Sequence, residues 1–185
     1  MATAVARHAL YLPGRLIMDP TDFSAAAPYG GTRLGLTRLV VLRLGSTHKV
    51  ITAEEWGNQA VEVIHGGTSL VLGATLRAWD ADALAAIFLD TAEGDPSGER
   101  VVKFRADAGR AGTQLSTKAM KLLFVPRAVV RQPSIYIRQA VPVVADDAEI
   151  MLAPHEQFGI SVVFYAIPDT NEDVAEIGRL TDLTL

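Results

Sequence analysis

The segment Ser69–Phe88 constrains the fold most, because it predicts a strand that leads directly into a short, capped helix. Apolar residues recur at every second position from Leu70 to Leu76, which is typical of a strand with one face in a core. Asp80 then stands at the position of a helix N-cap, where a carboxylate accepts the free amide hydrogens of the first turn. We expect the helix to pack on a sheet through four largely buried residues, Trp79, Leu84, Ile87 and Phe88.

The rest of the chain predicts strands separated by turns. Gly45-Ser46 predicts a turn, and Gly66-Gly67 predicts the point where one strand stops before the next begins. Asn171–Leu180 favours one or two helical turns. The fold class that we predict is mainly β: an antiparallel β-sandwich or barrel with one flanking α-helix at about residues 80–88 and long loops. The expected strands cover residues 15–18, 37–44, 49–52, 60–64, 69–76, 101–105, 120–125, 134–144 and 160–167.

A chain of 185 residues is long enough for a single domain, residues 1–185, with a substantial core. Prolines and glycines punctuate residues 1–35, so we expect an extended N-terminal arm there and the β-sandwich or barrel core at residues 36–185. Two loops, Asp90–Gly98 and Ala106–Ser116, are long enough to reach a neighbouring subunit. The chain has no cysteine, no apolar run of membrane-spanning length and no signal-peptide pattern, which predicts folding in a cytoplasm and no membrane partner.

The net charge is −4, but acidic and basic residues are concentrated in different parts of the chain. Residues 100–138 hold nine Lys or Arg and one acid, whereas residues 139–185 hold nine Asp or Glu and one Arg. Two interpretations remain open: loop placement alone, or oppositely charged surfaces that suit head-to-tail stacking of copies. The acidic balance of the whole chain disfavours tight nucleic-acid binding.

Residues with catalytic or metal-binding chemistry are present, but not in the arrangements that such sites require. Asp146, Asp147 and Glu149 offer oxygen ligands without the spacing of a calcium loop, so a solvated turn is the preferred interpretation. No nucleophile elbow and no phosphate-binding loop occurs. We expect no enzyme activity, no cofactor, and no catalytic or metal-binding residue. The histidines have no ligand spacing among them: His8, His48, His65 and His155.

Several passages of the chain resemble the tail tube proteins of long-tailed bacteriophages. These passages are Tyr29–Gly35, Ala53–Gly57 with Val61–Gly66 after it, Leu70–Phe88 and Ile160–Asp169. The resemblance implies a β-sandwich or barrel with a flanking helix, whose copies form hexameric rings that stack into a tube for DNA passage. It also implies a location in the virion tail after synthesis in the bacterial host cytoplasm. Other tail proteins are then partners, and genomic DNA passes through the lumen without specific binding.

The leading hypothesis is therefore a self-assembling structural protein of a phage tail. One alternative is another virion ring component, such as a tail terminator, neck or baseplate protein, because the fold by itself does not assign the machine. The long N-terminal arm departs from the family's minimal tube subunit and would also fit a tail-end or neck ring. A third hypothesis, from a different class, is a ligand-binding β-barrel with a pocket lined by Trp56, Trp79 and Tyr136.

Overall fold

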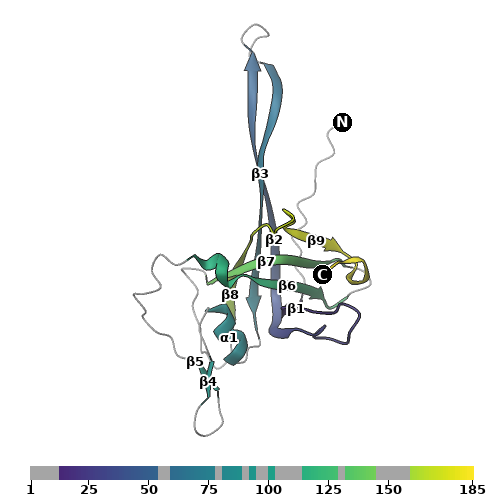
Figure 1. Ribbon diagram of the computed structural model, residues 1–185, viewed down its shortest axis with the longest axis vertical. Helices are drawn as coiled ribbons and strands as arrows, with labels where there is room; N and C mark the ends of the chain where they lie inside the picture. Colours follow the sequence, from purple (N-terminus) through teal and green to yellow (C-terminus); the bar gives the residue numbers. More distant parts are fainter. Residues whose placement is uncertain are drawn as a thin grey trace.

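The computed structural model describes residues 13–53, 59–77, 81–88, 92–94, 100–102, 114–128, 132–144 and 159–185. It confirms the predicted fold class, because these residues form mainly antiparallel strands with one short helix (Figure 1). The principal sheet contains β1 (Gly14–Met18), β2 (Thr32–Ala53), β3 (Gln59–Leu76), β6 (Met120–Pro126), β7 (Ser134–Val144), β8 (Ile160–Ala166) and β9 (Ala175–Gly178). The other elements are α1 (Ala81–Ile87), a small hairpin of β4 (Ala92–Gly94) and β5 (Arg100–Val102), and the 3-10 turns η3 (Leu115–Lys118) and η4 (Leu180–Asp182).

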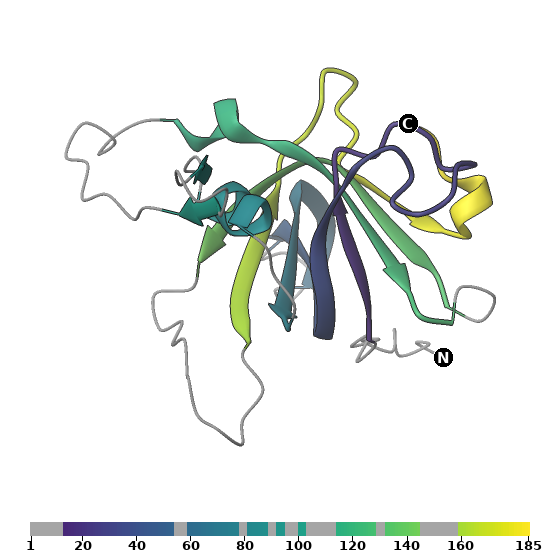
Figure 2. The ribbon, with the colours of Figure 1, turned by 90° about the horizontal axis from the view of Figure 1, so that it is seen from below.

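The seven strands follow the order β6-β1-β2-β3-β8-β7-β9, and β6 also pairs with β7. The strands therefore curve around a common core, as the view from below shows (Figure 2). β7 pairs with β8 through residues 140–144, whereas its pairs with β6 end at Ala140. Pro142 lies beyond that point, so β8 is its single described neighbour in the sheet. This position explains how a residue without an amide hydrogen is accommodated in the strand.

The main core lies inside this curved sheet and under α1. The alternation predicted for β3 is confirmed, since Leu72 and Leu76 are buried while the residues between them are partly exposed or small. In α1, Leu84 and Ile87 are buried as expected, but Phe88 is only partly buried against the core. The helix contacts β2 and β7, which places it against the sheet as its apolar stripe predicted. Trp79 and Asp80 lie outside the described residues.

The predicted turn at Gly45-Ser46 and the predicted interruption between strands at Gly66-Gly67 are both wrong. β2 and β3 are continuous strands of 22 and 18 residues, and Gly45 pairs with Ser69 inside their ladder. Thr47 pairs with Gly67 and His48 with His65, which leaves Gly66 as an extra residue in β3. The double glycine is therefore a β-bulge, and Gly67 has a φ of +131°, a conformation that glycine adopts without strain.

The chain does not divide at residue 36 into a separate N-terminal arm and a core. β1, within the expected arm, lies between β6 and β2, and its residues Leu16 and Ile17 are fully buried. The residues after β1 also pack on the body, because Phe23 stacks edge-on against the buried Tyr136 with ring centroids 5.1 Å apart. The core therefore includes the chain from Gly14 onward.

Two other segments differ from expectation because strand pairing decides their conformation. Ala175–Gly178, expected in helical turns, is β9 and pairs with Ser134–Ile137 of β7, so the polar backbone is satisfied by a partner far away in sequence. Within the loop expected at Asp90–Gly98, residues 92–94 are β4, paired with β5. Of the second loop, Ala106–Ser116, the structure describes residues 114–116.

Candidate self-assembly surface

The distal parts of β2 and β3 form a two-stranded ribbon that projects from the body of the molecule (Figure 1). We define the ribbon as residues 44–53 and 59–69. β1 pairs with β2 only as far as Thr37, and β8 pairs with β3 only from Val71 onward. Within the described part of the chain, both outer edges of the ribbon are therefore unpaired. The ten β2 residues of the ribbon, at the usual rise of a strand, span about 33 Å.

Apolar side chains occupy both faces of the ribbon. Val50 and Val63 are direct cross-strand partners, and 45% and 59% of their surfaces are exposed. Ile51 and Ile64 follow them in sequence and therefore lie on the opposite face. Of the eleven large hydrophobic residues that are exposed in the described structure, six belong to the ribbon: Leu44, Val50, Ile51, Val61, Val63 and Ile64.

A free ribbon of this kind is unfavourable in water. An isolated two-stranded hairpin is at best marginally stable, because neither face is covered. A long, apolar edge also presents unpaired amide and carbonyl groups that act as a template for another strand. Soluble proteins usually blunt such edges with charges, whereas the described residues of this ribbon carry only Lys49 and Glu62. The ribbon is therefore suited to contact with another protein chain.

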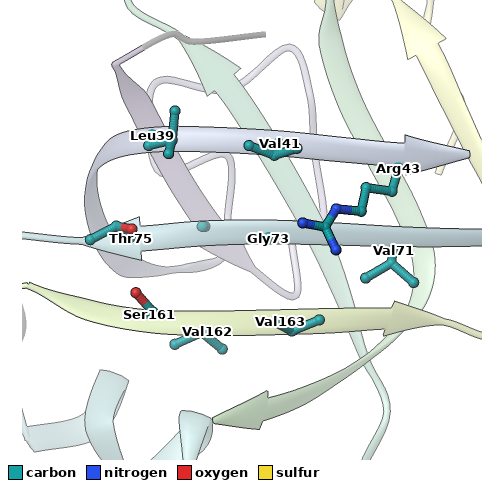
Figure 3. Close-up of a pocket in the computed structure, with 10 residues that line it drawn as sticks. Leu39, Val41, Arg43, Val71, Gly73, Thr75, Ser161, Val162 and Val163 are labelled. Atoms are coloured by element: carbon teal, nitrogen blue, oxygen red, sulfur yellow. The ribbon is translucent and has the colours of Figure 1, made fainter. Parts of the chain in front are cut away.

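A shallow apolar groove of about 190 Å³ lies at the base of the same two strands, on the outer face of the sheet (Figure 3). Gly73 lies at its centre, and a Cβ atom added there would contact only the Val41 carbonyl oxygen, at 3.8 Å. The side chain of Arg43 extends across β3 beside Gly73. The groove is lined by Leu39, Val41 and Arg43 of β2, Val71, Gly73, Ala74 and Thr75 of β3, and Ser161, Val162 and Val163 of β8.

Two of the four histidines come together on the ribbon, which their separation in sequence did not predict. His48 and His65 are cross-strand partners, and the His65 ring lies 3.3 Å from the hydroxyl oxygens of both Ser46 and Thr68. In the described residues, no group of three or more His, Asp or Glu is placed to hold a metal ion. His8 and His155, and the acidic turn of Asp146, Asp147 and Glu149, lie outside those residues.

Tyr136 does not line an open pocket, as the ligand-binding hypothesis required. Its side chain is fully buried in a second, small apolar cluster, where burial raises the pKa of its hydroxyl group. This cluster also contains Leu183, so it fastens the C-terminal residues to the sheet. The other two residues expected in that pocket, Trp56 and Trp79, lie outside the described residues.

The segregated charges meet within one chain at Arg138. This residue of the basic segment lies on β7, and its guanidinium group donates a hydrogen bond to the Glu176 carboxylate. Its Nε atom lies 3.7 Å from a carboxylate oxygen of Asp169 and 3.9 Å from one of Asp173. All three acids belong to the acidic segment. At this place the opposite charges hold the C-terminal residues to β7, so these groups are not free to join two copies.

Glu176 should make stability depend on acid pH. Burial of its carboxylate raises its pKa, but hydrogen bonds from Thr184 and the charge of Arg138 outweigh that effect and hold the pKa below its usual value. Ionised Glu176 therefore stabilises the folded state above the pKa of the unfolded chain, about 4.3. This contribution is lost as the pH falls through the lower pKa of the folded protein. Urea unfolding from pH 7 to 3 should show a smaller loss of stability for Glu176→Gln than for the unsubstituted protein.

Comparison with known proteins yields no family for this chain. A scan against protein-family models and a search of curated proteins each found no match. In the described part of the structure, no helix combines the length and the apolar character needed to cross a membrane.

Proposed function

We propose that this protein is a self-assembling structural subunit whose copies join through the β2–β3 ribbon. The observation that carries the proposal is the projecting ribbon, with exposed apolar side chains on both faces and two edges that pair with no strand of the described structure. We further propose that the assembly is the tube of a phage tail, built from hexameric rings, because of the sequence resemblance to tail tube proteins. Other tail proteins are then its partners at the ends of the tube, and DNA passes through the lumen.

The two free edges of the ribbon are complementary. β2 and β3 run antiparallel, so the β3 edge of one copy placed beside the β2 edge of the next continues the same antiparallel alternation. Copies related by rotation about an axis along the ribbon repeat this contact. Such a head-to-tail contact closes into a ring when the rotation divides a full turn, and closure leaves no free edge. A ring of subunits joined in this way satisfies the exposed backbone of every ribbon.

Shortening the ribbon should abolish assembly while the body of the molecule stays folded. Ser46 and Thr68 are cross-strand partners, so a two-residue Asn-Gly turn that replaces residues 47–67 would close the hairpin there. Among the described residues removed, those at 47–52 and 59–67 have exposed side chains, so the core is unchanged. Negative-stain electron microscopy and sedimentation velocity should show rings or tubes for the full-length chain and monomers for the shortened chain.

A pair of substitutions separates the chemistry of the ribbon from its length. Val50→Lys with Val63→Glu places opposite charges across the ladder, which preserves the net charge and the strand pairing but removes the apolar contact. The matched control, Leu36→Lys with Ile177→Glu, changes two residues of similar exposure outside the ribbon. Only the ribbon pair should reduce assembly, by about tenfold or more in the concentration required. The proposal would be contradicted by full-length protein that stays monomeric at high concentration, or by a shortened chain that still assembles. Single rings without tubes would instead favour a terminator, neck or baseplate ring.

A further inference from the structure

Ring closure through strand edges would leave uncovered the two faces of the ribbon tip, which we define as residues 49–52 and 61–64. Side chains of a β-strand point away from its hydrogen-bonding edges, so edge pairing brings neighbouring side chains into contact but leaves the outward surface of each face uncovered. Val50 and Val63 lie on one face of the tip, and Ile51 and Ile64 on the other, all of them at least 40% exposed. A segment that is apolar on both faces fits between two surfaces. The tip therefore needs a partner surface in addition to its neighbours in the ring.

The groove around Gly73 has the properties of such a surface. Its walls are the apolar side chains of Leu39, Val41, Val71 and Val163 (Figure 3), and a Cβ atom added at Gly73 would meet only the Val41 carbonyl oxygen within 4 Å. The groove lies on the opposite face of the sheet from the core, so no described element of the same chain covers it. The ribbon tip and this groove are thus two uncovered apolar surfaces on one molecule, and they belong to the same two strands.

The spacing of these two surfaces along the strands matches a simple stacking of copies. Val41 in the groove and Ile51 at the tip are ten residues apart on β2, a distance of about 33 Å. A second copy shifted by about that distance along the ribbon brings the tip of one chain to the level of the groove of the other. Because the tip and the groove are different surfaces, the contact is head-to-tail and can repeat from copy to copy.

Charge also favours this partner. Arg43 is the charged residue among those that line the groove, and its side chain is exposed. The tip carries Glu62, the cross-strand partner of Ile51, so an acidic group lies beside the apolar residues that would enter the groove. Lys49 is a diagonal neighbour of Glu62 on the same face, and its longer side chain can extend to water. A carboxylate facing a guanidinium group would set the register of the contact.

We propose that the ribbon tip of one copy docks in the Gly73 groove of a second copy in the next ring, with Glu62 facing Arg43. The inference rests on the proposed self-assembly and assigns its axial contact: strand edges join copies within a ring, and the tip and groove join one ring to the next. The occupant of the groove is thus a second copy of this chain.

Charge reversal tests the proposed pair directly. Arg43→Glu and Glu62→Arg should each raise the concentration at which rings stack by about tenfold or more, because each brings like charges together. The double variant, Arg43→Glu with Glu62→Arg, should restore stacking. Arg38→Glu is the matched control, since Arg38 is exposed on the same strand but does not line the groove. The readouts are tube length in negative stain and sedimentation velocity.

A second variant fills the groove without disturbing the fold. Gly73→Leu adds a side chain where the nearest atom outside the adjacent residues is 3.8 Å from the new Cβ, so the monomer should keep its stability. Rings should form and tubes should not. Full-length tubes from Gly73→Leu, or from both single charge reversals, would overturn the tip-and-groove contact while leaving ring formation intact. Unsubstituted protein that forms no rings at all would instead overturn the proposed function. The two failures are therefore distinguishable.

Discussion

Replacing Phe164 with alanine should lower the free energy of unfolding by about 3–5 kcal/mol, the range for removing a large aromatic ring from a core. Phe164 lies in the middle of β8, between Leu72 of β3 and Pro142 of β7, and none of its surface is exposed. Strands β3 and β7 flank the residue on both sides, so the surroundings should relax only partly into the cavity left by the ring. Chemical denaturation below the concentration of assembly measures the change, since assembly would itself add stability.

Tyr165→Ala is the matched control for Phe164→Ala. Tyr165 is the next residue of the same strand, but it points to the outer face and half of its surface is exposed. Its replacement should cost less than about 1 kcal/mol, within the range of ordinary surface substitutions. If the two variants lost equal stability, the assignment of the inner and outer faces of β8 would be wrong, and with it the placement of the groove.

Replacing Arg138 with methionine should lower the free energy of unfolding by about 2 kcal/mol. Methionine keeps most of the volume of the side chain, so the loss reports the removal of the cation from among Asp169, Asp173 and Glu176. Removing one partner of a buried ion pair costs more than this, but Asp173 is largely exposed and water would screen its charge. The stability difference should shrink as the pH falls and the Glu176 carboxylate becomes protonated.

Two further variants identify the source of the Arg138 effect. Arg127→Met removes an exposed arginine just beyond β6 and should change stability by less than about 0.5 kcal/mol. Adding Glu176→Gln to Arg138→Met should recover part of the loss, because one of the uncompensated carboxylates disappears. Two losses that simply add would show that Arg138 and Glu176 contribute independently, contrary to the contact between them.

The elements predicted correctly are those whose signal is local. The alternation from Leu70 to Leu76 and the β-branched run at residues 160–166 each specify a half-buried strand, because side chains of a strand alternate between its faces. The apolar stripe that includes Leu84 and Ile87 likewise specified a helix on a sheet. These patterns depend on residues within one or two turns or a few strand positions, so the sequence is sufficient to find them.

The elements predicted wrongly are those whose conformation a distant partner decides. Gly45 and Gly66 have the local character of turn residues, but a ladder between β2 and β3 satisfies the backbone around both and turns one into a bulge. Ala175–Gly178 is a strand because β7 offers it a free edge, not because its residues favour β structure. His48 and His65 meet for the same reason, since strand register brings them together across 17 positions of sequence.

The candidate assembly surface was the hardest feature to predict. Val50 and Val63 have the apolar, β-branched character of core residues, and the sequence placed them in strands. It did not show that both faces of those strands lack a covering layer, because burial depends on what packs from elsewhere in the chain. The sequence by itself thus determined a mainly β chain with one helix, through the local periodicity of its apolar residues. Only the tertiary structure decided which of those residues form the core and which remain exposed on the ribbon, because that depends on where the other strands end.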